Sequence, residues 1–230
     1  MTTAGTGRPA VEGLRERKKR AMRRQLSDTA ARMFLERGFD AVRVADVGEA
    51  CGVSEKTVFN YFPSKEALLL DRLEATADAL RTHLPDPALT PVGAMLAILD
   101  HERDVLATAL TTDADADADR ALAQYRQFGD LIRNTPSLRA YQSDIADRFV
   151  DIAAEALATR TGLRPDDPEP QIAAATLLGL WRVQFRALRT HVRPGHPLPD
   201  AIDAVACEVR RAAQLAEAGL AAFPAPAEPR

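Results

Sequence analysis

The chain has 230 residues, of which 46% are hydrophobic, 5% aromatic and 27% charged, with a formal net charge of −3. This length suits two helical domains with a sizeable core, and the weak acidity excludes a protein that is basic all over. No apolar run reaches the roughly 18 residues that a membrane-spanning helix needs. The N-terminus also lacks the apolar core of a signal peptide.

Basic residues are concentrated towards the N-terminus. Residues 1–66 hold 13 Lys or Arg against 9 Asp or Glu, whereas residues 67–230 hold 17 against 24. Eight of the basic residues lie between Arg8 and Arg24. A basic region on an acidic body favours contact with a polyanion at that end, although a solvated helix start explains these charges equally well.

The hydrophobic pattern predicts an all-α chain without strands. Residues 1–13 lack periodicity and are predicted to be a disordered arm, and residues 223–230 a flexible tail. The alternating Asp and Ala of residues 113–119 predict a flexible acidic loop, because they lack the glycine and glutamate of a calcium loop. The predicted helices cover residues 14–37, 44–51, 54–61, 64–82, 91–110, 120–133, 136–160, 171–191 and 199–220.

The most informative segment is residues 44–65, VADVGEACGVSEKTVFNYFPSK. Two short helices meet there at a tight turn, where Gly52 is expected to take the positive φ that costs glycine little. The small residue Gly48 lets the two helices cross closely, and Ser54 is an N-cap candidate for the second helix. This pattern is typical of a helix-turn-helix, whose second helix enters the DNA major groove.

The segment from Leu14 to Leu70 resembles the DNA-binding domain of the TetR (tetracycline repressor) family. The matching pieces are FLERGFDAVRVADV, CGVSEKTVFNYF and PSKEALL, in that order. The resemblance implies an all-α protein of about nine helices. It implies a three-helix helix-turn-helix domain at residues 14–63 and a helical domain at residues 64–222 that binds a ligand and dimerises.

The family's DNA contacts carry over to the matching positions of this chain. Lys56 and Thr57 open the recognition helix, Tyr61 matches an aromatic contact, and Lys65 matches a phosphate-binding lysine. Cations near the N-terminus are expected to follow phosphates or enter a minor groove. The expected DNA-binding residues are Arg17, Lys18, Arg43, Ser54, Lys56, Thr57, Phe59, Asn60, Tyr61 and Lys65.

Three positions in this segment depart from the family's pattern. Phe59 stands where the family usually has tyrosine, so a hydroxyl-to-phosphate bond is lost, while the ring can still press on a thymine methyl or a sugar. Arg43 replaces a common threonine and can grip a phosphate or a guanine. Gly48 replaces alanine, at a helix cost of about 1 kcal/mol. Val58 and Phe62 are expected in the core.

The second domain is expected to bind an effector and a second copy of the chain. An apolar pocket with a few polar groups is predicted between the middle helices, although plain core is the alternative for its residues. By resemblance, the two last helices form a four-helix interface with their symmetry mates. The pocket candidates are Leu99, Arg103, Tyr125, Phe128 and Trp181, and the interface candidates are Ala174, Leu178, Ala206 and Val209.

These features predict a ligand-responsive transcriptional regulator. The leading hypothesis is a repressor that binds a palindromic operator in double-stranded DNA as a homodimer and is released by a small hydrophobic effector of unknown identity. An activator or a ligand-independent regulator is the alternative. An enzyme is far less favoured, because no nucleophile elbow, phosphate loop or zinc spacing is present, and no cofactor or metal is expected. The expected location is the cytoplasm, on nucleoid DNA.

Overall fold

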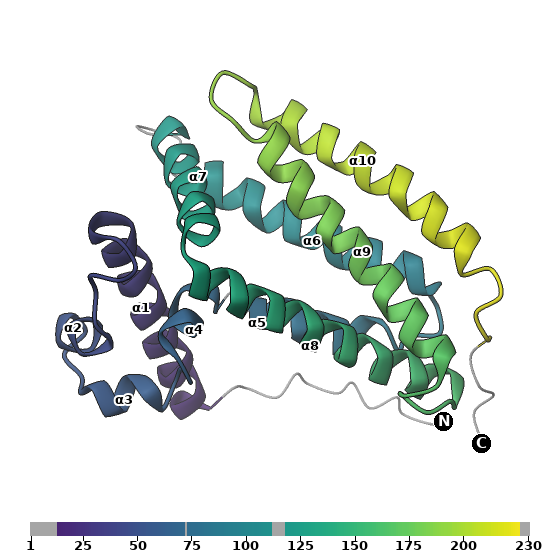
Figure 1. The fold of residues 1–230 in the computed structure, drawn as a ribbon, viewed down its shortest axis with the longest axis horizontal. Helices are drawn as coiled ribbons and strands as arrows, with labels where there is room; N and C mark the ends of the chain where they lie inside the picture. The colour runs from purple at the N-terminus through teal and green to yellow at the C-terminus, as the bar shows by residue number, and fades with distance from the viewer. Residues whose placement is uncertain (1–12, 72, 112–117, 226–230) are drawn as a thin grey trace, which may run out of the picture. The chain divides into compact units, whose positions relative to one another are not determined.

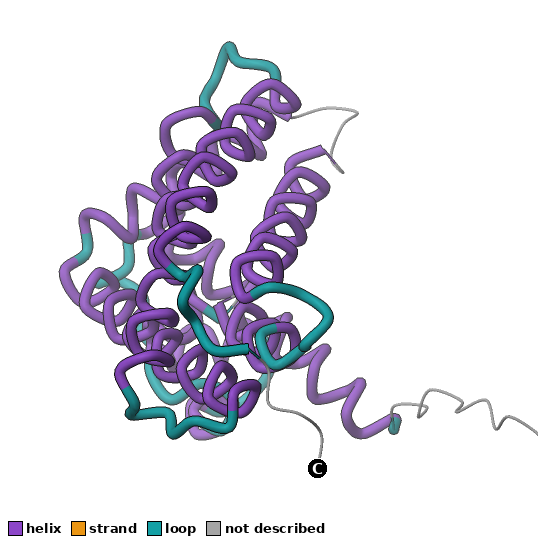
Figure 2. Tube along the Cα trace, turned by 90° about the vertical axis from the view of Figure 1, so that its right-hand side faces the viewer, coloured by secondary structure: helices purple, strands orange, loops and turns teal. Residues whose placement is uncertain are grey.

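The computed structural model describes residues 13–71, 73–111 and 118–225. Within these ranges the chain forms ten helices and no strand (Figures 1 and 2). The prediction of an all-α fold is therefore confirmed. Most of the predicted N-terminal arm, the acidic run and the C-terminal tail lies outside the described residues. The chain divides into two compact units, Met1–Asp71 and Arg72–Arg230.

The first unit contains four helices around a small apolar core. They are α1 (Leu14–Arg37), α2 (Val44–Ala50), α3 (Glu55–Phe59) and α4 (Lys65–Leu70). In α1 the buried residues follow helical spacing, and the helix ends at Gly38, whose φ of 86° suits glycine. This core is made by large apolar side chains that are almost fully buried, among them Leu26, Phe34, Val47, Val58, Phe62 and Leu68.

The second unit is a bundle of six helices. They are α5 (Leu73–His83), α6 (Pro91–Thr111), α7 (Ala118–Asn134), α8 (Pro136–Thr161), α9 (Pro168–His191) and α10 (Leu198–Gly219). The helix α9 packs against α8, α10 and α6, while α5 packs against α6 and α8. Figure 1 shows α9 and α10 side by side and running in opposite directions. This bundle buries Leu99, Leu138, Phe149, Leu157 and Leu177.

Apart from shifts of one or two residues, the helix boundaries differ from the sequence prediction at two places. The predicted helix over residues 64–82 is divided into α4 and α5, with Arg72 between them outside the described residues. Asp71 caps α4 and binds Arg23 of α1 through its carboxylate, a long-range contact that periodicity cannot reveal. The helix α9 begins at Pro168, ahead of the predicted start at residue 171, because proline at the first helical position needs no amide partner.

The described residues hold neither a membrane-spanning helix nor a cluster of metal ligands. None of the helices there combines the length and the apolar character that crossing a membrane requires. The same part of the chain contains no group of three or more His, Cys, Asp or Glu residues arranged to hold a metal ion. The two cysteines, Cys51 and Cys207, are unpaired thiols.

Candidate nucleic-acid interface

The helices α2 and α3 approach each other very closely at Gly48. A Cβ atom placed on Gly48 would lie 2.8 Å from the carbonyl oxygen of Val53 and 3.3 Å from a methyl carbon of Val58. The amide of Val53 donates to the carbonyl of Gly48 at 2.9 Å, which fixes the approach. Gly52 in the turn has a φ of 71°. The glycine at position 48 is therefore a packing requirement, and not only a helix cost.

The N-terminus of α3 is capped by Ser54. Its hydroxyl oxygen accepts from the amide of Thr57 at 3.1 Å, and the hydroxyl groups of Ser54 and Thr57 lie 2.8 Å apart. This cap satisfies an amide that the short helix would otherwise leave free. The two predicted DNA-binding hydroxyls therefore also hold the start of α3 in shape.

The helix α3 has one buried face and one exposed face. Val58 is fully buried, and Phe62 just beyond the helix is 1% exposed, which confirms the prediction that both belong to the core. On the other face Lys56 and Asn60 are exposed, and the Phe59 ring is 47% exposed. A large exposed apolar ring between polar side chains is the composition expected of a surface that meets bases and sugars.

Arg43 directly precedes α2 and is bound to Asp46. Its Nε and Nη2 donate to the same carboxylate oxygen of Asp46 at 3.2 and 2.9 Å, and the Arg43 amide donates to the other oxygen at 2.9 Å. The Arg43 side chain remains 79% exposed. Hydrogen bonding from Arg43 lowers the pKa of the Asp46 carboxyl, so the pair stays charged at neutral pH.

Lys65 at the start of α4 is held over two aromatic rings. Its ammonium nitrogen lies 4.3 Å from the ring centre of Phe39 and 5.7 Å from that of Phe34. Both distances are within the range of cation–π attraction. Lys65, predicted as a phosphate contact, therefore also joins α4 to the end of α1.

Sequence reasoning missed the role of Arg23, which it counted only as one of many N-terminal cations. The Arg23 guanidinium donates to the backbone carbonyl of Tyr61 at 3.1 Å and to the Asp71 carboxylate at 2.8 Å. It also lies 4.9 Å from the centre of the Phe62 ring. Arg23 thus anchors the end of the recognition segment, and half-burial distinguishes it from the exposed cations Arg17 and Lys18 on the first turn of α1.

The predicted pocket residues lie on α6, α7 and α9 of the second unit. Leu99, Arg103 and Trp181 are buried, whereas Tyr125 and Phe128 on α7 are half-buried. The ring centre of Trp181 lies 5.6 Å from that of Phe149 and 4.3 Å from that of Phe185. The three rings thus form an aromatic row. Burial raises the pKa of the Tyr125 hydroxyl, and the charge of Arg189 opposes this.

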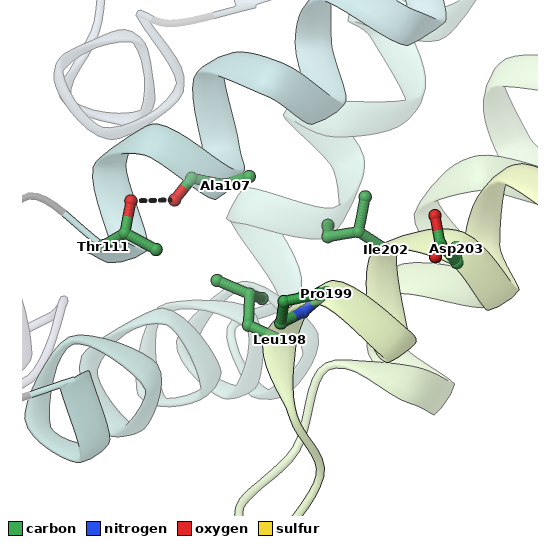
Figure 3. Close-up of a pocket in the computed structure, with 6 residues that line it drawn as sticks. All are labelled: Ala107, Thr111, Leu198, Pro199, Ile202 and Asp203. Carbon is green, nitrogen blue, oxygen red and sulfur yellow. Dashed lines mark hydrogen bonds between the residues drawn. The ribbon is translucent and has the colours of Figure 1, made fainter.

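Figure 3 shows an open, mainly apolar pocket of about 310 Å³ at another place in this unit. Leu198 and Ile202 of α10 face Ala107 and Thr111 of α6 across it. None of the predicted pocket residues contributes to its lining.

The four predicted interface residues are buried within a single chain. Ala174 and Leu178 of α9, with Ala206 and Val209 of α10, are all at most 7% exposed, because α9 packs on α8 and α10. Their side chains therefore hold the protomer together. The exposed apolar side chains of the same two helices are Ile172, 65% exposed, and Leu215, 78% exposed.

The fold defines a class of protein. The small first unit holds a helix-turn-helix with a capped recognition helix, and a larger helical unit follows it in the chain. This arrangement is that of a DNA-binding transcriptional regulator.

Comparison with known proteins gives the family. Residues 26–71 match the model for bacterial regulatory proteins of the tetR family, and residues 93–214 match the MftR C-terminal domain. The chain belongs to the TetR family, and it is a transcriptional regulator. Members of this family bind operator DNA as dimers and respond to small-molecule effectors.

Two curated relatives are similar over most of the chain. The putative mycofactocin biosynthesis transcriptional regulator MftR of Mycobacterium tuberculosis (strain ATCC 25618 / H37Rv) is 29% identical over 158 residues, which cover 67% of this chain and 73% of that protein. The HTH-type transcriptional regulator TcmR of Streptomyces glaucescens is 29% identical over 199 residues, 81% of this chain and 84% of that protein. Both relatives are transcriptional regulators.

A solved structure shares the fold. The SmeT–triclosan complex superposes with a TM-score of 0.50 at 18% sequence identity, over 86% of this chain and 91% of that one. At this identity the similarity shows the fold alone. The resemblance read from residues 14–70 is confirmed by these comparisons.

Proposed function

We propose that this regulator is a repressor that binds a palindromic operator as a homodimer and is released by a small, mainly apolar effector. The observation that carries the DNA-binding part is the exposed face of α3, where Lys56, Phe59 and Asn60 stand opposite the buried Val58. One such helix reads only a few base pairs, so two copies related by a two-fold axis are needed for specificity.

Around α3, cations would hold the DNA backbone. Arg43 is presented beside α2 by Asp46, and Arg17 and Lys18 are exposed on α1. These residues would contact phosphates, while Lys56 and Tyr61 would position or read bases. The location that follows is the cytoplasm, on the nucleoid DNA.

The effector site that we propose lies among α6, α7, α8 and α9. The aromatic row of Phe149, Trp181 and Phe185 supplies apolar surface, and Arg103 and Tyr125 supply polar groups. This combination is typical of small-molecule sites. Effector binding would favour a conformation whose two α3 helices no longer match the operator half-sites. A 100-fold loss of operator affinity requires about 2.7 kcal/mol of coupling.

The test is a gel-shift titration with DNA taken from upstream of the protein's own gene. The wild type should shift this DNA at concentrations where random DNA is not shifted, and the shift should weaken as salt rises. The double variant Lys56→Ala with Tyr61→Ala should abolish the specific shift, because it removes one proposed contact from α3 and one from the turn that follows it.

A matched control removes a cation elsewhere. Arg126→Ala changes an exposed side chain on α7 and should leave the shift unchanged. The proposal fails if the wild type shifts both DNAs equally, or if the double variant binds as well as Arg126→Ala.

A further inference from the structure

A half-buried carboxylate joins three helices of the second unit. Glu102 on α6 accepts from the hydroxyl of Thr76 on α5 at 2.5 Å through one oxygen. Its other oxygen accepts from the side-chain amide of Gln184 on α9 at 3.2 Å. The three residues are separated by 26 and 82 positions in sequence. We call Thr76, Glu102 and Gln184 the three-helix clamp.

The clamp continues into the buried Arg103. Arg103 Nη1 donates to the side-chain oxygen of Gln184 at 2.7 Å, and Nη2 is bound to Asp100. Thr76, Arg103 and Gln184 are at most 6% exposed, and they make up three of the four buried polar residues in the described part of the chain. The polar groups of this core are therefore gathered at one place.

Buried polar groups of this kind fix geometry more than they add stability. Each hydrogen bond contributes only about 1 kcal/mol net, but an unpaired partner left in the core is costly. A sliding or rotation of α5 against α6 would separate Thr76 from Glu102. The exposed ion pair of Glu74 on α5 with Arg148 on α8 also holds α5, so the clamp is the buried part of its polar anchoring. The clamp thus selects one position of α5.

The clamp also adjoins the residues proposed for the effector site. Arg103 directly follows Glu102, and Trp181 lies one helical turn before Gln184 on α9. A ligand that moves Arg103 or Trp181 would therefore change the partners of Gln184 and Glu102. The helix at the other end of the clamp, α5, is the first helix of the second unit and follows the helix-turn-helix unit in the chain.

We propose that Thr76 and Glu102 are positioning residues that couple the effector site to operator binding by holding α5 in one place. This inference rests on the proposed function. When the clamp is broken, α5 samples more positions and the operator-competent population falls. The apparent Kd for operator rises in proportion to that loss.

The test uses three full-length variants and two measurements. Thr76→Val keeps the shape of the side chain and removes the hydroxyl, Thr76→Ser restores the hydroxyl, and Thr82→Val removes an exposed hydroxyl from the same helix. Operator binding is measured by fluorescence anisotropy, and hydrogen exchange is followed on residues 73–83. Thr76→Val should weaken operator binding about threefold or more and speed exchange of α5, since a fall in the competent population to about one third triples the apparent Kd. Thr76→Ser and Thr82→Val should match the wild type.

Each outcome separates this inference from the proposed function. If the wild type does not bind operator DNA, the proposed function fails, and hydrogen exchange alone decides whether the clamp holds α5. If the wild type binds and Thr76→Val binds as well as Thr82→Val or more tightly, the coupling role is overturned. Should Thr76→Val not fold, Glu102→Gln replaces it, because its amide group keeps an acceptor for only one of the two donors, and the same comparison applies.

Discussion

At the scale of single residues, the helix-turn-helix unit uses several side chains in two ways. Lys65 is a predicted phosphate contact, and its ammonium nitrogen also lies 4.3 Å from the ring centre of Phe39. Ser54 is a predicted DNA contact and the cap of α3. These side chains are therefore held in place before DNA arrives, which lowers the entropy lost on binding.

Replacing Lys65 separates its structural role from DNA binding. Lys65→Met should lower the free energy of unfolding of the first unit by about 1 kcal/mol, because the cation–π contact with Phe39 is lost. Lys65→Arg should retain most of that stability. Thermal unfolding without DNA measures both variants, and equal stability of Lys65→Met and wild type would contradict the structural role.

Gly48 offers a second test at this scale. Helix propensity alone predicts that Gly48→Ala stabilises α2 by about 1 kcal/mol. The 2.8 Å approach to the Val53 carbonyl predicts a net loss of about 1 kcal/mol instead, because backbone must move to admit the methyl group. Denaturant unfolding distinguishes the two, and a stabilised variant would refute the close crossing of α2 and α3.

At the scale of helices, tertiary contacts decide which segments are ordered. The five-residue α3 is far too short to be stable alone, so its shape depends on Val58, on Phe62 and on the Ser54 cap. In the second unit the three-helix clamp places the half-buried Glu102 carboxyl between α5, α6 and α9. Burial raises the pKa of Glu102, opposed by hydrogen bonds from Thr76 and Gln184.

This pKa shift predicts how stability depends on pH. A raised pKa in the folded state means that the native protein binds the proton of Glu102 more tightly than the unfolded chain does. The amount that Glu102 adds to the free energy of unfolding is therefore fully present at low pH. It is lost as pH rises through the pKa that Glu102 has in the folded protein. Glu102→Gln removes this dependence. An unperturbed glutamate titrates at about pH 4.3, so urea unfolding from about pH 4 upwards should show the stability of the wild type falling relative to Glu102→Gln as pH rises. A constant difference would contradict the prediction.

Much of the helical layout was predictable because local chemistry encodes it. Pro91 and Pro136 begin α6 and α8, as local rules predict. By the same rules Gly38 follows the end of α1, Gly162 follows the end of α8, and Ser54 caps α3. What escaped prediction depends on distant partners. The division between α4 and α5 coincides with the contact of Asp71 to Arg23, 48 residues away, and the clamp joins residues up to 82 positions apart.

The candidate site shows the same division between local and distant information. Family positions identified Lys56, Phe59 and Asn60, and the structure places their side chains on the exposed face of α3. Sequence patterns could not separate outer from inner positions on α9 and α10. Both helices carry Ala and Leu on several faces, so buried residues were selected as interface candidates.

At the scale of the whole molecule, a two-fold dimer is the assembly that operator reading requires. Ile172 lies near the start of α9 and Leu215 near the end of α10, and the two helices are antiparallel neighbours, so both residues lie at the same end of the pair. They are the two most exposed large apolar side chains of the described residues, at 65% and 78%. We infer that this end of α9 and α10 contributes to the dimer interface.

Charge at these positions should disrupt the dimer. Ile172→Glu combined with Leu215→Glu should shift the protein towards monomer and weaken operator binding at least about tenfold, because each half-site is then bound separately. Val105→Glu, which charges an exposed apolar position on α6, is the matched control. Analytical ultracentrifugation measures the state of association. A double variant that stays as dimeric as Val105→Glu would exclude this end of the helices from the interface.

Selection of binding sites from random double-stranded DNA shows whether two copies of α3 read a palindrome. The selected sequences should share two inverted half-sites whose centres are about one helical turn or more apart. Selection with Lys56→Ala should change the preferred bases in both half-sites equally. Selected DNA with no shared sequence, or with one unrepeated half-site, would mean that two copies of α3 do not read a palindrome.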